Sequence, residues 1–122
     1  MAQQIIIQKM DIRTFLIDWI TASNAFDTKR YLSFYLENAI LDDPSVGKIF
    51  KGHKGIQDYF ESYFIGYNTS MELVALTISD DGTAAHLKVT FRGDFPEGII
   101  GGIFDFQFRE EKIAFIKADL LH

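Results

Sequence analysis

Apolar residues near the start of the chain recur at spacings of three and four, as they do along one face of a helix. From residue 12 onward they fall at Ile12, Phe15, Leu16, Trp19 and Ile20. This spacing predicts a first helix that buries a single stripe of side chains. The segment 24–27 interrupts the pattern and ends that helix.

Two more helices are predicted by the same spacing. Asp27 and Thr28 are suited to cap a helix that contains Tyr31, Leu32, Tyr35 and Leu36. Residues 39–43 then form a short predicted strand that ends at the turn around Pro44. A third helix follows residue 55, and its apolar face consists of Ile56, Phe60, Tyr63, Phe64 and Tyr67.

After Asn68 the pattern changes to the two-residue alternation of strands. Strands are predicted over residues 71–79, 85–95, 99–109 and 112–120, and the Gly at the 80–82 turn suits a tight hairpin. Gly101 and Gly102 lie inside a strand pattern and predict a bulge or bend there. The order of elements indicates an α+β fold, with three N-terminal helices packed in a strongly curved, mainly antiparallel sheet whose central strand is 85–95.

Length and composition support one globular domain over residues 1–122. The chain has 122 residues, of which 48% are hydrophobic and twelve are Phe. That is enough apolar side chain for a sizeable core, and it lies outside the range of disordered chains. Aromatic side chains also line concave ligand pockets, so composition alone does not separate a core from a pocket.

Charge and cysteine content exclude several classes of partner. The net charge of −5 disfavours nucleic acid, because phosphate binding relies on Lys and Arg. The absence of Cys excludes disulfides and thiolate metal sites and fits a cytoplasmic location. Residues 1–9 lack the pattern of a secretory signal, and no apolar stretch is long enough for a membrane helix.

Three short segments follow one another along the chain: Asn24-Ala25-Phe26-Asp27, Ile40-Leu41-Asp42-Asp43-Pro44 and the stretch from Gly52 to Phe60. In this order they resemble the ketosteroid isomerase and SnoaL-like families of the nuclear transport factor two-like superfamily. The resemblance covers nearly the whole chain. It implies a cone-shaped, cystatin-like α+β barrel, with an apolar cavity between the bent sheet and a long helix. It also implies a homodimer through the outer face of the sheet.

The resemblance carries over only part of a catalytic site. In ketosteroid isomerase an Asp is the general base, while a Tyr and a protonated Asp form the oxyanion hole. The base falls on Asp43, the oxyanion Tyr on Trp19, the oxyanion Asp on Phe104, and a supporting Tyr near Phe60. Losing one oxyanion donor costs on the order of 100-fold to 1000-fold in related chemistry, so steroid isomerisation is not expected.

We expect a largely apolar pocket inside the cone, with Asp43 at its rim. Two helices and two strands each present an aromatic stripe, and these stripes must meet. The residues expected to line the pocket are Phe15, Trp19, Phe60, Phe64, Val89, Phe91, Phe104 and Phe106. Asp43 is also suited to a second role, that of a turn residue capping the segment after Pro44.

The sequence gives less support to other residues as catalytic groups or metal ligands than it gives to Asp43. Alternation places His86 on the face opposite Leu87 and Val89, so we expect it at the surface or an interface. Asp105 is one position out of register with Phe104 and should point outward. Asp119 lies near the end of the last strand, either at the cavity mouth or in solvent. The three His show no metal-ligand spacing, and no metal site is predicted.

Two functions remain open. The first is a container that binds a small apolar molecule without catalysis. The alternative is an acid/base enzyme of isomerase, cyclase or dehydratase type, which uses Asp43 as general base and no cofactor. A polar group other than Asp43 that converges on the cavity would distinguish the two.

The strand at 71–79 supports the expected homodimer. Val74, Leu76 and Ile78 alternate with Met71, Leu73 and Ala75, so both faces of this strand are partly apolar. One of those faces needs a partner.

Overall fold

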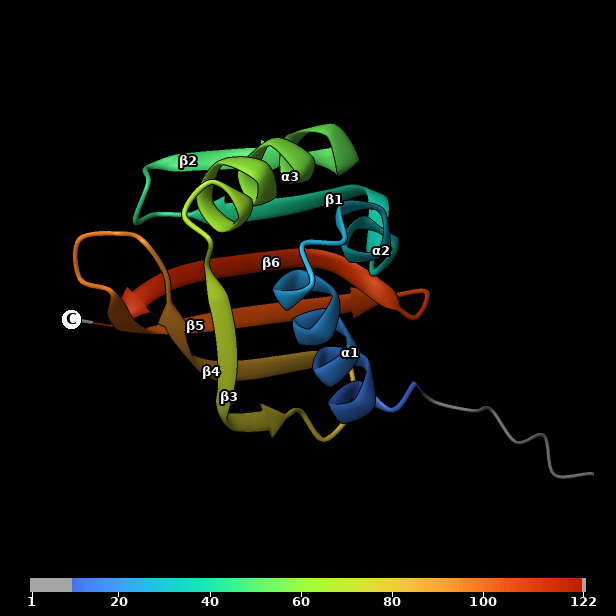
Figure 1. Cartoon of the computed structure of the whole chain (residues 1–122). Helices are drawn as coiled ribbons and strands as arrows, with labels where there is room; N and C mark the ends of the chain where they lie inside the picture. The colour runs from blue at the N-terminus through green and yellow to red at the C-terminus, as the bar shows by residue number, and fades with distance from the viewer. Residues whose placement is uncertain (1–9, 122) are drawn as a thin grey trace, which may run out of the picture.

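The chain forms a curved, open sheet whose inner side holds the helices (Figure 1). The computed structural model describes residues 10–121; the N-terminal residues 1–9, where we expect no signal, and His122 lie outside this part. The helical segments are α1 (Ile12–Asn24), α2 (Thr28–Ser33), α3 (Gly52–Phe60) and the π-helical turn η1 (Glu61–Ile65). The strands are β1 (Tyr35–Asp43), β2 (Lys48–Lys51), β3 (Ser70–Ile78), β4 (Ala84–Arg92), β5 (Ile99–Arg109) and β6 (Lys112–Leu121).

The strand order is β2-β1-β6-β5-β4-β3. Every neighbouring pair is antiparallel except β1 and β6, which are parallel. The predicted α+β class and mainly antiparallel sheet are confirmed. The prediction that the strand at 85–95 is central is wrong, because β1 joins β6 and adds a hairpin on that side. Strand β4 therefore lies next to the edge strand β3.

Asp side chains fix the starts of the first two helices. Asp11 accepts a hydrogen bond from the backbone N–H of Thr14, and Asp27 accepts one from Arg30. Such caps satisfy backbone donors that have no partner within the helix. Helix α2 ends at Ser33, earlier than predicted, because Tyr35 pairs with Ile113 of β6 and belongs to β1.

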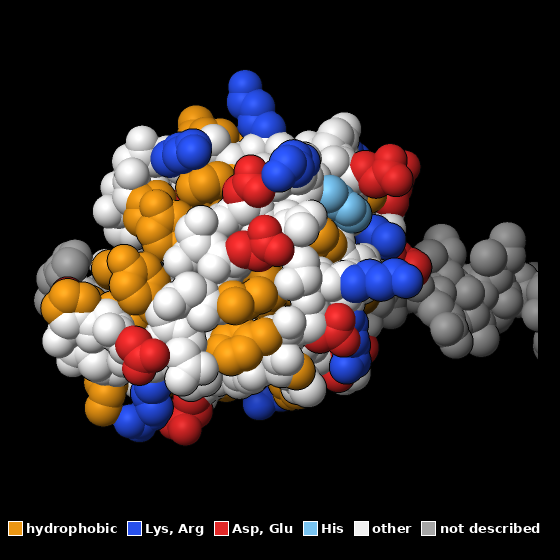
Figure 2. Space-filling model, turned by 45° about the horizontal axis from the view of Figure 1, so that its top comes forward, with side chains coloured by type: hydrophobic (Ala, Val, Ile, Leu, Met, Phe, Trp, Pro, Cys, Tyr) orange, Lys and Arg blue, Asp and Glu red, His pale blue; other side chains and the backbone are white. Residues whose placement is uncertain are grey.

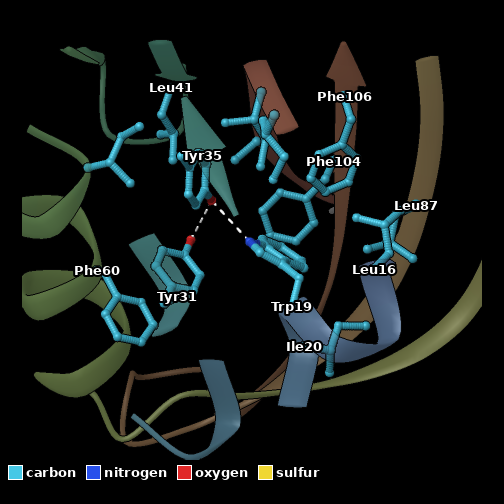
Figure 3. Close-up of a cluster of buried hydrophobic side chains, with 14 of the residues drawn as sticks. Leu16, Trp19, Ile20, Tyr31, Tyr35, Leu41, Phe60, Leu87, Phe104 and Phe106 are labelled. Atoms are coloured by element: carbon cyan, nitrogen blue, oxygen red, sulfur yellow. Dashed lines mark hydrogen bonds between the residues drawn. The ribbon is translucent and has the colours of Figure 1, made fainter. Parts of the chain in front are cut away.

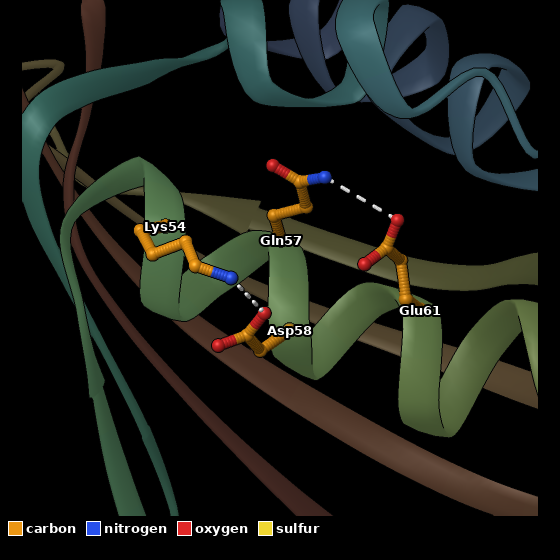
Figure 4. Close-up of polar contacts among 4 residues, drawn as sticks. All are labelled: Lys54, Gln57, Asp58 and Glu61. Carbon is orange, nitrogen blue, oxygen red and sulfur yellow. Dashed lines mark hydrogen bonds and ion pairs between the residues drawn. The ribbon is translucent and has the colours of Figure 1, made fainter.

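Helix α3 turns a polar face outward and an aromatic face inward. On the outer face, Lys54 and Asp58 form an ion pair at 2.9 Å, and Gln57 donates to Glu61 over 3.3 Å (Figure 4). Pairs at this spacing contribute only about 0.2–0.5 kcal/mol each. The burial of the inner face, which includes Phe60, therefore supplies most of the stability of this helix against the sheet.

A β-bulge explains the apolar residues on both faces of β3. Leu73 pairs with Val89 and Ala75 with Lys88, so Val74 is the extra residue between them. Beyond the bulge, Leu76 returns to the inner face. The bulge thus weakens the argument that this strand needs a partner on its outer face.

No bulge occurs at the two glycines of β5. Gly101 and Gly102 pair without interruption with both β4 and β6. Of the bulge or bend predicted there, the bulge is therefore wrong. The space left by Gly102 is filled by an aromatic ring, because a Cβ at this position would lie 2.0 Å from Cε2 of Phe91.

The centre of the molecule is a packed aromatic core (Figure 3). The indole N–H of Trp19 donates to the hydroxyl of Tyr35 over 3.1 Å, and that hydroxyl donates to Tyr31 over 2.8 Å. Tyr31 in turn stacks on Phe60 with ring centroids 4.0 Å apart. All four side chains are at most 1% exposed, so this region is filled rather than hollow.

None of the helices in the described part of the chain is long and apolar enough to cross a membrane.

Candidate functional site

A pocket of about 160 Å³ opens at one end of the curved sheet. It lies between the end of β1, the inner face of α3 and η1, and the loop 93–98 that joins β4 to β5. Its wall includes six aromatic side chains: Tyr59, Tyr63, Phe64, Tyr67, Phe91 and Phe95. In the space-filling view, hydrophobic side chains gather on the left, at the end of the molecule where Figure 1 shows this loop (Figure 2).

Asp43 is the buried carboxylate of the pocket wall, with 5% of its surface exposed. It is the last residue of β1, and its Oδ1 accepts hydrogen bonds from the backbone N–H and the hydroxyl of Ser45. Its Oδ2 accepts one from the hydroxyl of Tyr59 over 2.7 Å. The carboxylate therefore both caps the turn after Pro44 and faces the pocket.

Tyr59 is the polar group that meets Asp43 at the pocket. Burial raises the pKa of Tyr59 well above its ordinary value, and the nearby Asp43 raises it further. The phenol consequently stays protonated and keeps donating to Oδ2. A carboxylate oxygen has two acceptor positions, so Oδ2 retains one for a second donor.

No cation among the described residues forms an ion pair with Asp43. Among residues 10–121 the ion pairs are Lys54–Asp58 and His86–Asp105, neither of which includes it. Lys48 pairs with Asp43 across the β1–β2 hairpin, but its ammonium lies 5.0 Å from the ring centroid of Phe50.

The pocket also contains hydroxyl groups and a second carboxylate. Within the described residues the hydroxyls of Tyr63 and Tyr67 have no hydrogen-bond partner, and both residues line the pocket. Thr69 donates to the backbone carbonyl of Tyr63 over 3.0 Å. Glu97, an exposed residue of the 93–98 loop, also lines the pocket.

The residues predicted to line a cavity divide into two groups. Phe64 and Phe91 line the pocket together with Asp43. The other six lie elsewhere: Trp19, Phe60, Val89, Phe104 and Phe106 are in the filled core, and half-buried Phe15 packs on Phe34 and Phe108.

The positions that correspond to the oxyanion donors of ketosteroid isomerase also lie in this core. The indole N–H of Trp19 is used by Tyr35, and Phe104 packs edge-on against the Trp19 ring at 5.1 Å. Neither side chain lines the pocket.

The remaining candidates lie away from the pocket. His86 and Asp105 contact each other at 2.6 Å, and both are about half exposed. Asp119 is half-buried and accepts a hydrogen bond from the backbone N–H of Leu120. No group of three or more potential metal ligands occurs in the described part of the chain.

Sequence reasoning missed Tyr59, Phe95 and Glu97. A signal for Tyr59 was present, because Tyr59, Tyr63 and Tyr67 recur every four residues along the third predicted helix. The π-helical turn η1 contains Tyr63 and lies between Tyr59 and Tyr67. Phe95 and Glu97 lie in a loop whose path no local pattern specifies.

Comparison with known proteins gives one family match and many similar structures. A model of the SnoaL-like domain matches residues 16–116. A protein assigned as a polyketide cyclase from Sinorhizobium meliloti is 19% identical, with a TM-score of 0.79 over 91% of this chain and 98% of that chain. A protein assigned as a ketosteroid isomerase from Kribbella flavida is 10% identical, with a TM-score of 0.78 over 90% of this chain and 77% of that chain.

A third structure of the same fold contains a ligand. It is a protein of ketosteroid isomerase-like fold from Catenulispora acidiphila in complex with trimethylamine. It is 11% identical, with a TM-score of 0.74 over 85% of this chain and 82% of that chain. A search of curated proteins gives no match. At these identities the structural likeness shows the fold.

Proposed function

The chain belongs to the SnoaL-like domain family, and from this premise we propose that it binds a small, largely apolar molecule in the pocket beside Asp43. The observation that carries the proposal is the placement of one buried carboxylate in a wall that is mainly aromatic and aliphatic. Apolar pockets with a few convergent polar groups are the usual form of small-molecule sites.

The size of the pocket limits the ligand. Its volume of about 160 Å³ is close to that of an engineered cavity of ~150 Å³ that binds benzene. It is smaller than the ~300–1,000 Å³ of sites for drug-sized ligands. We therefore propose a ligand of single-ring size, and the trimethylamine bound by the Catenulispora protein is also a small molecule.

Acid/base catalysis is the second candidate, favoured by the polar groups that accompany Asp43. The free acceptor position on Oδ2 suits removal of a proton from a carbon next to a carbonyl group. The hydroxyls of Tyr63 and Tyr67, which have no hydrogen-bond partner among residues 10–121, are suited to donate to the resulting enolate oxygen. Return of the proton from Asp43 to another carbon completes an isomerisation, and the step requires no metal or organic cofactor.

The binding proposal is tested with phenol, a neutral single-ring probe. We expect saturable amide shift changes in NMR around residues 43–46, 59–69 and 91–100. Ile100 lines the pocket, whereas its neighbour Ile99 is 56% exposed. Ile100→Trp should abolish these changes, and the matched control Ile99→Trp should leave them intact. If both variants bind phenol equally well, phenol binds outside this pocket and the binding proposal is wrong.

The catalytic proposal is tested by hydrogen exchange in deuterium oxide. Cyclohexanone is incubated with the protein, and exchange of the protons next to its carbonyl group is followed by NMR. We expect exchange faster than in buffer, and its loss in Asp43→Asn. If phenol binds while the protein leaves this exchange unchanged, the protein is a container.

We also propose that two copies associate through the outer face of the sheet. The helices lie on the other side of the sheet (Figure 1). The register of the strands places Ile40, Ile103 and Phe115 on the outer face. A cytoplasmic location, which the cysteine-free sequence favours, stays a prediction.

A further inference from the structure

The carboxylate of Asp43 is buried and forms no ion pair within residues 10–121. Asp43 is the only charged residue among 10–121 that is buried. Buried charges in proteins are normally paired, because transfer of an ion out of water is costly. Its hydrogen bonds from Ser45 and Tyr59 satisfy the oxygens, but all of these donors are neutral.

The aromatic wall next to Asp43 has the chemistry of a cation site. The rings of Tyr59 and Tyr63 are 5.4 Å apart, those of Tyr59 and Phe64 are 5.9 Å apart, and those of Phe64 and Phe91 are 5.9 Å apart. These rings come from α3, η1 and β4 and form one continuous surface. The faces of such rings carry partial negative charge and attract ammonium groups, as in the aromatic cages for methylated ammonium ligands.

The charges around the pocket all have the same sign. Asp43 and Glu97 both line it, and none of the described residues that do so is Lys, Arg or His. The whole chain carries a net charge of −5. A cleft lined by charge of one sign raises the local concentration of the opposite ion, so the field at this pocket favours a cation.

From these observations we propose that the ligand of the pocket is a small organic cation, with an alkylated ammonium group set against the aromatic wall and facing Asp43. This inference rests on the proposed binding function and specifies its ligand class. The volume of about 160 Å³ admits an ammonium group with several methyl substituents. Asp43 supplies the opposite charge, and Glu97 at the rim attracts the cation from solvent.

The test compares two ligands that differ only in charge. Choline and the alcohol in which a carbon atom replaces the choline nitrogen have the same shape. In titration calorimetry we expect choline to bind about tenfold more tightly or better, because the cation–π and carboxylate contacts require the positive charge. Equal or tighter binding of the uncharged alcohol would overturn the proposal without any variant being made.

Two variants localise the effect to this pocket. Asp43→Asn should weaken choline about tenfold or more and leave the uncharged alcohol unchanged, whereas Glu97→Gln should weaken choline by only about two- to threefold. Unchanged choline affinity in Asp43→Asn would overturn the proposal. If Asp43→Asn does not fold, choline binding is measured with Ile100→Trp and Ile99→Trp instead. Loss of choline binding in Ile100→Trp alone supports the proposal. If both variants still bind choline, the proposal is overturned.

Phenol separates failure of this inference from failure of the proposed function. If phenol binds in the pocket and choline does not, the inference is wrong and the binding function stands. If neither phenol nor choline nor its uncharged analogue binds, both proposals are wrong.

Discussion

The hydroxyl of Tyr59 on α3 donates to Oδ2 of Asp43 at the end of β1 over 2.7 Å. Both side chains are at least 95% buried, so the contact joins a helix to the end of a strand of the sheet with little exposure to solvent. The same contact leaves one acceptor position of Oδ2 free at the pocket. It is therefore a structural link and also part of the proposed site.

Removal of this hydroxyl should lower stability. Tyr59→Phe leaves a buried carboxylate without one of its donors, and hydrogen bonds to charged groups contribute about 1.5–3 kcal/mol. We expect a loss of that size in the free energy of unfolding measured with urea. The matched control is Tyr63→Phe, whose hydroxyl has no partner among the described residues and should change stability by less than about 0.5 kcal/mol. Equal losses in both variants would contradict the role of the contact.

Alkaline pH should unfold the protein cooperatively. Burial raises the pKa of Tyr31, Tyr35 and Tyr59 above the ordinary value of 10.0. A phenol whose pKa is higher in the folded chain contributes stability below pH ~10, and this stability is lost as the pH rises further. Each such group changes stability by about 1.4 kcal/mol per pH unit, so three give about 4 kcal/mol per unit.

The absorbance of tyrosinate checks this prediction. Tyr31, Tyr35 and Tyr59 should ionise together with the loss of the circular dichroism signal. Ionisation of these three side chains before the loss of that signal would contradict their burial.

Gly102 should be sensitive to a single methyl group, because the Phe91 ring occupies the space over its Cα. Gly102→Ala should cost about 1–3 kcal/mol of stability through overpacking. Gly101 is the matched control, since a Cβ there would lie 3.3 Å from the Leu121 side chain and Gly101→Ala should change stability by less than about 1 kcal/mol. The measurement is the midpoint of thermal unfolding of each variant. A smaller decrease for Gly102→Ala than for Gly101→Ala would contradict the described packing.

The outer face of the sheet should mediate self-association. Ile103 pairs with Lys88 and Asp119 in the outward register and lies on β5, one of the two central strands. Sedimentation at micromolar concentration should give a dimer, and Ile103→Glu should give a monomer with unchanged circular dichroism. Val74→Asp, at the exposed bulge of the edge strand, should remain a dimer. A monomeric natural chain would contradict the proposed association.

Local patterns were sufficient to predict most elements of this fold. The spacing from Ile12 to Ile20 and the alternation of Leu87, Val89 and Phe91 correspond to α1 and β4. The predictions were wrong where pairing with a segment distant in the sequence determines the local structure. Tyr35 fits a helical spacing from Tyr31, yet it lies in a strand because β6, far along the chain, offers a parallel partner.

The candidate site was predictable only in part. The Asp43-Pro44 step marked the end of a strand, and the structure places Asp43 at the pocket. The aromatic stripes were assigned to one cavity, but Tyr31 and Tyr35 supply enough additional volume to fill the centre of the cone. The open space therefore lies farther out, where the β4–β5 loop brings Phe95 and Glu97. A loop path of this kind depends on tertiary contacts such as that of Asp94 with Tyr67, which no local pattern reports.

The central claim is that ligands bind at the Asp43 pocket and not in the aromatic core. Intermolecular nuclear Overhauser effects between bound phenol and assigned aromatic protons test it most directly. We predict contacts to Tyr59, Phe64 and Phe91 and none to Phe104 or Phe106, which are 1% exposed. Contacts to Phe104 and Phe106 without contacts to Phe64 and Phe91 would contradict the account and return the binding site to the centre of the cone.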